Sequence, residues 1–182
     1  SGLWGPTEGP EALLNALSGD RWTVELWLNL SSTTDKVSII DMGQAYEPGM
    51  SLTLNDEALL LVNHYAGVMA RCAPKLIAGK WLHLAIVRSG SKVDWYIDGR
   101  KDASTKMTSV VTQQLPDLHK PEDRENEHRG FKPMNFERRR QNRFNLAIGS
   151  DRHGGGGMKG LVDEMRISKV ARYSGRFKPE SF

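Results

Sequence analysis

Cysteine and long apolar segments are almost absent from this sequence, and each absence excludes a class of protein. Cys72 is the single cysteine among 182 residues, so no internal disulfide can form and the small disulfide-built scaffolds are excluded. No apolar run approaches the roughly 20 residues that a membrane-spanning helix requires, and no signal peptide is visible. A chain of this length can bury its own core. The sequence therefore predicts one domain over residues 1–182, without a membrane span, as an excerpt of a larger protein.

Motifs for nucleophilic, metal-dependent or phosphate chemistry are missing as well. The five histidines are scattered without an i, i+4 pair, and there is no Cys-x-x-Cys, so the sequence offers no zinc motif. No Gly-x-Ser-x-Gly motif marks a catalytic serine. The glycines at 154–157 do not form a P-loop, because Lys159 is followed by Gly160 instead of Ser or Thr. These absences favour a chain that is not an enzyme.

Charge is concentrated in one segment of the chain. Residues 117–143 hold eight of the 25 Lys and Arg residues and six of the 22 Asp and Glu residues. Arg138, Arg139, Arg140 and Arg143 form a basic cluster that fits phosphate, a sulfated sugar or an acidic surface, or that pairs with nearby carboxylates in a solvated loop. Because the rest of the chain is nearly neutral, no nucleic-acid partner is expected.

Alternating apolar and polar residues dominate the remaining sequence. Apolar positions recur every second residue in 22–30, 82–87 and 93–97, which is the period of a β-strand. Asp98-Gly99 supplies the two positive-φ residues that a tight hairpin favours. Further short strands bounded by turn residues are expected at Val37–Asp41, Ser51–Leu54, Leu59–Asn63, Phe144–Ile148 and Leu161–Ile167. Eight or more strands predict an all-β sandwich or jelly roll.

Two segments depart from the strand pattern. The spacing of leucines in Glu11–Leu17 predicts one short helix packed against a sheet. The segment at about 103–143 is too long for a hairpin loop and too polar for a core element, and Pro116, Pro121 and Pro133 interrupt any regular pattern. We therefore expect a charged insertion at about 103–143.

Five stretches together resemble one known family. Each encodes only strand alternation and a turn, but their order and spacing are those of bacterial laminin-G-like domains of the concanavalin A-like lectin/glucanase superfamily. The resemblance covers about residues 20–102 and 144–180 and leaves the insertion unmatched. The stretches are Gly79–Ala85 (GKWLHLA), Asp94–Gly99 (DWYIDG), Ile148–Asp151 (IGSD), Lys159–Ile167 (KGLVDEMRI) and Ser168–Pro179 (SKVARYSGRFKP).

The resemblance implies a fold more firmly than a function. It implies a concanavalin A-like jelly-roll sandwich of two antiparallel sheets packed face to face. In some relatives the loops along one edge hold Ca²⁺ or sugar, which makes Ca²⁺ the one candidate cofactor. Glucanases of this broad fold carry a Glu-x-Asp-x-x-Glu strand, and no Glu of this chain is followed two residues later by Asp. That departure argues against a glycan hydrolase.

Aromatic and acidic side chains on the polar faces of the strands are candidates for ligand binding. Glu25, Trp27 and Tyr96 alternate with apolar residues, so we expect them to be exposed on a sheet, where a ring stacks on a sugar and a carboxylate orients its hydroxyls. Packing of these aromatics beneath the insertion is the alternative. His64 and Tyr65, at the end of a predicted strand, have similar chemistry and the same two interpretations.

A glycine-rich loop is a second candidate ligand site. Asp151, Arg152 and His153 precede four glycines, and a backbone without side chains allows a ligand to approach closely. A flexible hairpin tip is the simpler interpretation of the same residues.

Asp163 is the candidate metal ligand. Strand alternation would place it on one face with Leu161, Met165 and Ile167, and a carboxylate on an apolar face requires a cation or several hydrogen-bond donors. Ca²⁺ is one such partner, and backbone or Arg donors are the structural alternative.

The sequence leaves three functions open, in decreasing order of support. The first is a non-catalytic module that recognises carbohydrate or glycoprotein within a larger secreted or cell-surface protein. The second is a structural or protein-interaction domain that contacts a protein partner through residues 117–143. The third is a glycan-active hydrolase.

Overall fold

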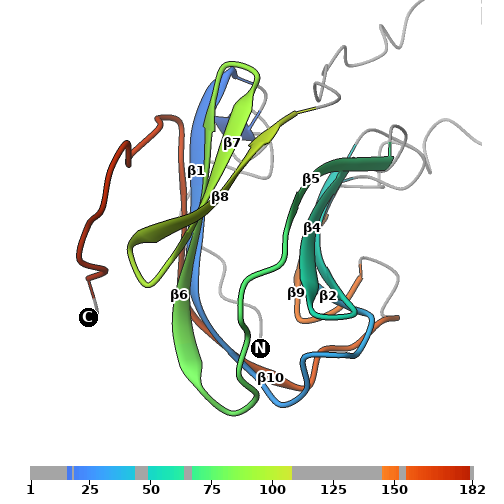
Figure 1. The fold of residues 1–182 in the computed structure, drawn as a ribbon. Coiled ribbons are helices and arrows are strands. Elements are labelled where there is room, and N and C mark those ends of the chain that lie inside the picture. The colour runs from blue at the N-terminus through green and yellow to red at the C-terminus, as the bar shows by residue number, and fades with distance from the viewer. Residues whose placement is uncertain are drawn as a thin grey trace, which may run out of the picture.

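This computed structural model describes residues 16–17, 19–43, 49–63, 67–107, 145–151 and 155–180, which contain ten β-strands. Among the described residues, no long helix lies between consecutive strands (Figure 1). They are β1 (Arg21–Leu30), β2 (Val37–Gly43), β3 (Gly49–Asn55), β4 (Ala58–Asn63), β5 (Gly67–Cys72), β6 (Trp81–Ser89), β7 (Lys92–Ile97), β8 (Arg100–Lys106), β9 (Asn145–Ile148) and β10 (Gly160–Ser168).

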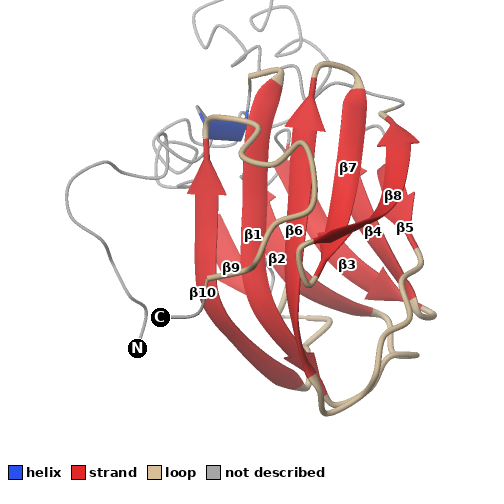
Figure 2. Cartoon of the chain, turned by 60° about the vertical axis from the view of Figure 1, so that its left-hand side comes forward, coloured by secondary structure: helices blue, strands red, loops and turns tan. Residues whose placement is uncertain are grey.

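The strands form two five-stranded antiparallel sheets that face each other. The order is β10-β1-β6-β7-β8 in one sheet, called sheet A here, and β5-β4-β3-β2-β9 in the other, sheet B. Figures 1 and 2 show the two layers, with strands from both ends of the chain side by side in sheet A, where β1 pairs with β10. The predicted all-β sandwich of two antiparallel sheets is confirmed.

The hydrophobic core lies between the sheets and is filled by the alternate residues that the sequence pattern selects. In β1, Trp22, Leu26 and Leu28 point inward and are buried, and Trp95 of β7 is buried with them. Sheet B contributes the aliphatic side chains of β2, β3 and β4 to the same core. Burying an aliphatic or aromatic side chain stabilises a fold by about 1.5–3 kcal/mol, so this contiguous core holds the two layers together.

Tight turns with positive φ join neighbouring strands in both sheets. Asp98 and Gly99 have φ values of 50° and 73° between β7 and β8, as predicted for a type I′ hairpin. Asp56 and Glu57, with φ values of 49° and 63°, make the corresponding turn between β3 and β4. Each turn fixes the register of the two strands that it joins. In the β7–β8 hairpin, Ile97 lies opposite Arg100.

The sequence pattern does not predict the edge strands β5 and β8. β8 also shows that the charged insertion starts later in the chain than predicted. β8 occupies Arg100–Lys106, so residues 103–106 belong to sheet A and the predicted boundary at about 103 is wrong. Its sequence, RKDASTK, carries no apolar alternation because an edge strand covers little core, and its charges discourage pairing with another chain.

The predicted insertion beyond Met107 and the protein-contact segment 117–143 lie outside the described residues. Ala16 and Leu17 are helical and buried, while the start of the predicted helix at Glu11 is also outside them.

Cys72 ties the two edge strands together and is predicted to be unreactive. Its buried Sγ donates to Oδ2 of Asp102 at 3.1 Å, and burial followed by this carboxylate raises the pKa of the thiol. Because the thiolate is the nucleophile, we expect the folded protein to resist iodoacetamide near about pH 8 and the urea-unfolded protein to be alkylated fully. Mass spectrometry measures the extent of alkylation. Complete alkylation of the folded protein would contradict this arrangement.

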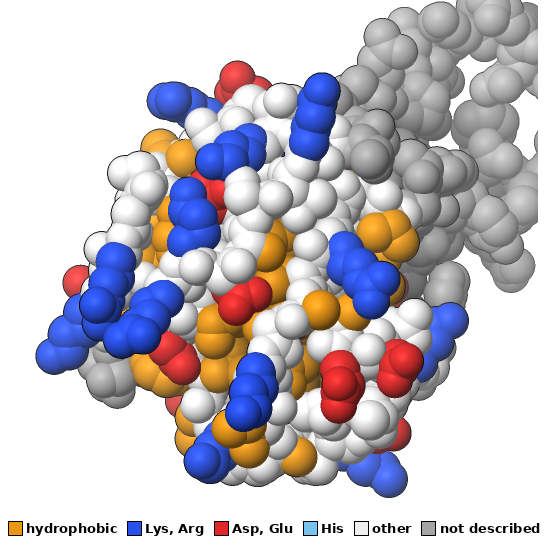
Figure 3. All heavy atoms as spheres, viewed as in Figure 1, with side chains coloured by type: hydrophobic (Ala, Val, Ile, Leu, Met, Phe, Trp, Pro, Cys, Tyr) orange, Lys and Arg blue, Asp and Glu red, His pale blue; other side chains and the backbone are white. Residues whose placement is uncertain are grey.

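The surface charge of the described residues is dispersed. On the face seen in Figure 3, Lys and Arg side chains are spread over the surface, some of them side by side at one edge, and Asp and Glu side chains lie among them. In the described part of the chain, no helix is long and apolar enough to cross a membrane.

Candidate functional site

The outer face of sheet A is divided into a covered part and an open part. After β10 the chain turns back over this sheet, and residues 169–180, called the C-terminal segment here, cross β1 and β6 (Figure 2). Its side chains form a small second core with the sheet, in which Ala171, Tyr173 and Phe177 pack on Ala85 and Tyr96. The C-terminal segment therefore closes part of a face that strand alternation alone leaves polar.

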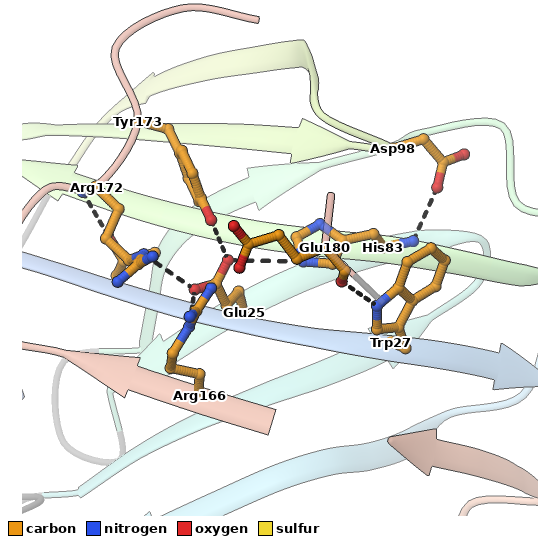
Figure 4. Close-up of polar contacts among 9 residues, drawn as sticks. Glu25, Trp27, His83, Asp98, Arg166, Arg172, Tyr173 and Glu180 are labelled. Atoms are coloured by element: carbon orange, nitrogen blue, oxygen red, sulfur yellow. Dashed lines mark hydrogen bonds and ion pairs between the residues drawn. The ribbon is translucent and has the colours of Figure 1, made fainter. Parts of the chain in front are cut away.

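Glu25 is the electrostatic anchor of the covered part. Its side chain is 2% exposed, and its Oε1 accepts from Nε of Arg166 at 2.5 Å and lies 3.3 Å from Nε of Arg172 (Figure 4). Its Oε2 accepts from the hydroxyl of Tyr173 at 2.6 Å. Burial, then the Glu25 carboxylate, raises the pKa of Tyr173, which keeps the phenol a donor. A buried carboxylate requires such partners, and two of the three come from the C-terminal segment.

Aromatic rings complete the covered part. Tyr173 stacks on Phe177 with ring centroids 3.5 Å apart, and Phe177 packs against Tyr96 at 5.6 Å and against His83 at 5.8 Å. The Tyr96 ring is fully buried by these contacts. Edge-to-face and stacked contacts of this kind contribute about 0.5–1.5 kcal/mol each beyond the area they bury.

Two of the predicted ligand-binding residues are therefore not exposed. The expectation that Glu25 and Tyr96 project from an open polar face is wrong, because the C-terminal segment lies on them. Among the described residues, those of 169–180 cover both side chains. Packing of the aromatic side chains beneath the insertion stays a prediction, because the insertion lies outside the described residues. Trp27 differs: it is half-buried, and its Nε1 donates to the carbonyl of Glu180 at 3.2 Å.

His83 sits neutral at the border of the covered part. It packs edge-on against Trp27 and Phe177, and its Nδ1 has no hydrogen-bond partner among the described residues. Burial lowers the pKa of His83 from 6.5, although Glu25, whose Oε2 lies 3.6 Å from Nε2, opposes that shift. The imidazole is thus neutral at neutral pH in the folded protein.

The lowered pKa of His83 predicts a loss of stability on mild acidification. Between the unfolded pKa of 6.5 and the lower folded pKa, the unfolded chain binds more protons, so the free energy of unfolding decreases as pH falls through this window. We expect urea denaturation between about pH 7.5 and pH 5 to show this decrease, and His83→Gln to flatten it. An identical slope in the variant would assign the effect to another group.

The open part of the same face presents two tryptophans. The register places Asn29 between Leu161 and Trp81, and Trp27 in the adjacent row. Trp81 is 45% exposed and Leu161 is 60% exposed. We call this surface the Trp27–Trp81 face; its two rows are Leu161–Asn29–Trp81 and Asp163–Trp27–His83.

Asp163 belongs to this open surface and not to the apolar face. β10 contains a bulge at Glu164, whose φ is 49°, and the pairing shifts so that Asp163 opposes Trp27 while Arg166 opposes Glu25. The extra residue turns Met165 toward the core and leaves Asp163 exposed, so Asp163 shares its face with Leu161 as predicted, and the prediction that Met165 and Ile167 lie on the same face is wrong. The Oδ1 of Asp163 accepts from the backbone N–H of Glu164 at 2.9 Å.

The described surroundings of Asp163 do not form a metal cluster. The described residues contain no group of three or more His, Cys, Asp or Glu side chains that could hold a metal ion. The desolvation argument for Ca²⁺ at Asp163 also disappears with its exposure.

The described part of the glycine-rich loop is fixed by hydrogen bonds to the side chain of Asp151 and to the backbone of β2. Asp151 accepts from the N–H of Gly155 through Oδ1 at 2.8 Å, and the carbonyl of Gly156 accepts from the N–H of Ser38 at 3.1 Å. These bonds pin the loop to β2. Arg152 and His153, with His64 and Tyr65 of the other predicted site, lie outside the described residues.

Sequence inspection missed Trp81, Asn29 and Leu161 as surface residues of one site. The alternation of β6 gave a usable signal, because Trp81 shares its parity with His83, whereas Leu82 and Leu84 share the core parity. What the sequence did not supply is the register that brings β10, β1 and β6 side by side.

Residues 9–119 match the model of a laminin-G-type family described as the concanavalin A-like lectin/glucanases superfamily. Domain 4 of an extracellular arabinanase from Geobacillus stearothermophilus, solved with arabinotriose, aligns with a TM-score of 0.55 and 20% identity. That alignment covers 85% of this chain but 63% of the arabinanase domain, less than two thirds of its length. No curated protein sequence matches the chain significantly.

Two further solved structures share the fold at lower identity. The CBM40 of the IT-sialidase from Ruminococcus gnavus aligns with a TM-score of 0.58 and 10% identity, covering 89% of this chain and 82% of the module. A SAP-like pentraxin from Limulus polyphemus aligns with a TM-score of 0.51 and 14% identity, covering 85% and 66%. At these identities the likeness is one of fold.

Proposed function

Because this chain belongs to the concanavalin A-like lectin/glucanase superfamily, we propose that it is a non-catalytic carbohydrate-binding module of a larger extracellular or cell-surface protein. The observation that carries the proposal is the two-sheet sandwich, which most of the chain shares with the arabinotriose-bound domain and the sialidase module. A rigid antiparallel sheet that presents aromatic side chains to solvent suits a sugar ring, because stacking requires a flat and fixed apolar surface.

The state of Glu25 supports a binding role over hydrolysis. A glycosidase needs two carboxyl groups on either side of the scissile bond, roughly 5–10 Å apart. Glu25 is buried and occupied by Arg166, Arg172 and Tyr173, so it is not available as an acid, base or nucleophile. On the open part of the face, Asp163 is a single carboxylate among the six residues of the two rows.

A glycan array with the 182-residue chain tests the proposal. We expect binding to a restricted set of oligosaccharides, measured once with Ca²⁺ and once with EDTA because Ca²⁺ remains the candidate cofactor of the family. The same oligosaccharides, incubated with the protein and assayed for new reducing ends, should remain intact. Silence on the array in both buffers contradicts carbohydrate binding, and release of reducing ends contradicts a non-catalytic role.

A further inference from the structure

We infer that the Trp27–Trp81 face is the carbohydrate-binding surface and that it takes an uncharged sugar chain; this inference rests on the proposed function. The surface joins three strands of one sheet, β10, β1 and β6, so its geometry is fixed by the antiparallel register. A site built on strands holds its side chains more precisely than one built on loops.

The apolar component of the surface is provided by two indoles. Trp27 and Trp81 are diagonal neighbours on adjacent strands, a relation in which Cβ atoms lie about 7–8 Å apart and large rings reach each other. Among the described residues, Trp81 is the one tryptophan in the exposed class. The other exposed large apolar side chains are aliphatic: Val68, Ile77, Leu146, Ile148, Leu161 and Val170. An exposed indole beside a second, half-exposed indole suits the C–H face of a sugar.

Trp27 is held in place before any ligand arrives. Its Nε1 donates to the Glu180 carbonyl, and its ring packs edge-on against His83 at 5.4 Å (Figure 4). The C-terminal segment therefore forms one wall of the surface while it leaves the other indole, Trp81, open. Fixing a contact side chain in advance lowers the entropy that is lost on binding.

Asn29 and Asp163 are the hydrogen-bond acceptors of the two rows, and neither row contains Lys or Arg. The Nδ2 of Asn29 donates to the carbonyl of Gly79 at 3.2 Å, which orients the amide and leaves its Oδ1 as an acceptor. Asp163, across from Trp27, uses Oδ1 for the Glu164 N–H and keeps Oδ2 as a second acceptor. Sugar hydroxyls donate to such groups, whereas a carboxylated or sulfated sugar would be repelled by Asp163. Uncharged glycans are thus the class that fits.

An NMR titration with indole ¹⁵N-labelled protein tests the site. The neutral probes are arabinotriose, xylohexaose, cellohexaose and mannohexaose, and the acidic probes are sialyllactose and hexagalacturonate. We expect a neutral probe to shift the indole N–H signals of Trp27 and Trp81, and to leave those of Trp22 and Trp95, which are buried in the core, unchanged.

Matched variants turn the titration into an affinity measurement. Trp81→Ala should weaken binding of the neutral probe at least about tenfold, since one stacking contact on this scale is worth about 1.4 kcal/mol. Val68→Ala, which shortens an exposed apolar side chain on sheet B, should change the affinity less than about twofold. Asp163→Asn keeps an acceptor and removes the charge, so it should narrow the preference for neutral over acidic probes.

The outcomes separate this inference from the proposed function. If no probe and no glycan on the array binds the parent protein, the proposed function is wrong and the inference falls with it. If a glycan binds while Trp81→Ala retains full affinity and neither indole signal shifts, the module binds sugar elsewhere and only the inference is overturned. Acidic probes that bind as tightly as neutral ones would overturn the assignment of ligand class.

Discussion

Replacing Glu25 by alanine is expected to lower the free energy of unfolding by about 3 kcal/mol and to release the C-terminal segment. The substitution removes the shared acceptor of Arg166, Arg172 and Tyr173. Breaking a buried ion pair costs about 3–5 kcal/mol, and the lower end applies because both guanidinium groups are about one-third exposed and can turn to water. Urea denaturation measures the loss.

Limited trypsin digestion measures the release of the segment. Lys169, Arg172 and Arg176 supply cleavage sites within it, so Glu25→Ala should be cut there faster than the parent protein. Asp35→Ala removes an exposed carboxylate and should change neither measurement. Glu25→Gln keeps the size of the side chain and one acceptor. Its stability and digestion rate should therefore lie between those of Glu25→Ala and those of the parent protein. A Glu25→Ala protein with parental stability and digestion rate would refute the anchoring role.

Gly99→Ala is expected to destabilise the fold by about 3 kcal/mol, also through the C-terminal segment. A Cβ at this position would lie 1.9 Å from the Phe177 carbonyl oxygen. The backbone φ of +73° is also unfavourable for a residue with a side chain. The clash would break the bond from the Phe177 N–H to the Gly99 carbonyl, now 2.9 Å, and lift the ring from Tyr96 and His83. The measurement is thermal and urea unfolding, with tryptophan and tyrosine fluorescence as the probe.

A second hairpin glycine separates backbone strain from the clash. Gly90 has a φ of +61°, and a Cβ built there meets nothing within 4 Å. Gly90→Ala should therefore cost only the strain of a left-handed alanine, about 1 kcal/mol. Equal destabilisation by Gly90→Ala and Gly99→Ala would mean that the approach of Phe177 contributes nothing.

The strand alternation predicted the fold well because the core follows it directly. Trp22, Leu26 and Leu28 lie at alternate positions in β1, and alternate residues of β6 and β7, such as Leu84 and Trp95, face the same core. β8 escaped prediction because an edge strand buries little and its polar sequence carries no periodicity. The bulge at Glu164 was equally invisible, since one inserted residue reverses the parity of everything before it without any glycine to mark it.

The candidate site was harder to predict, for a topological reason. Parity placed Glu25, Trp27 and Tyr96 on the same outer face, and that is where they lie. Which of them stays open depends on the C-terminal segment, which has no strand of its own and is held by single contacts such as Tyr173 to Glu25. Contacts between residues nearly 150 positions apart leave no local pattern in a sequence.

Hydroxyl-radical footprinting read by mass spectrometry tests the division of this face most directly. The protein alone should be oxidised rapidly at Trp81, more slowly at Trp27, and hardly at Tyr96, Trp22 or Trp95. Addition of the neutral oligosaccharide that binds best should then protect Trp81 and Trp27 together. Oxidation of Tyr96 as fast as Trp81, or a bound glycan that protects neither tryptophan, would contradict a covered half held by Glu25 and an open half that binds sugar.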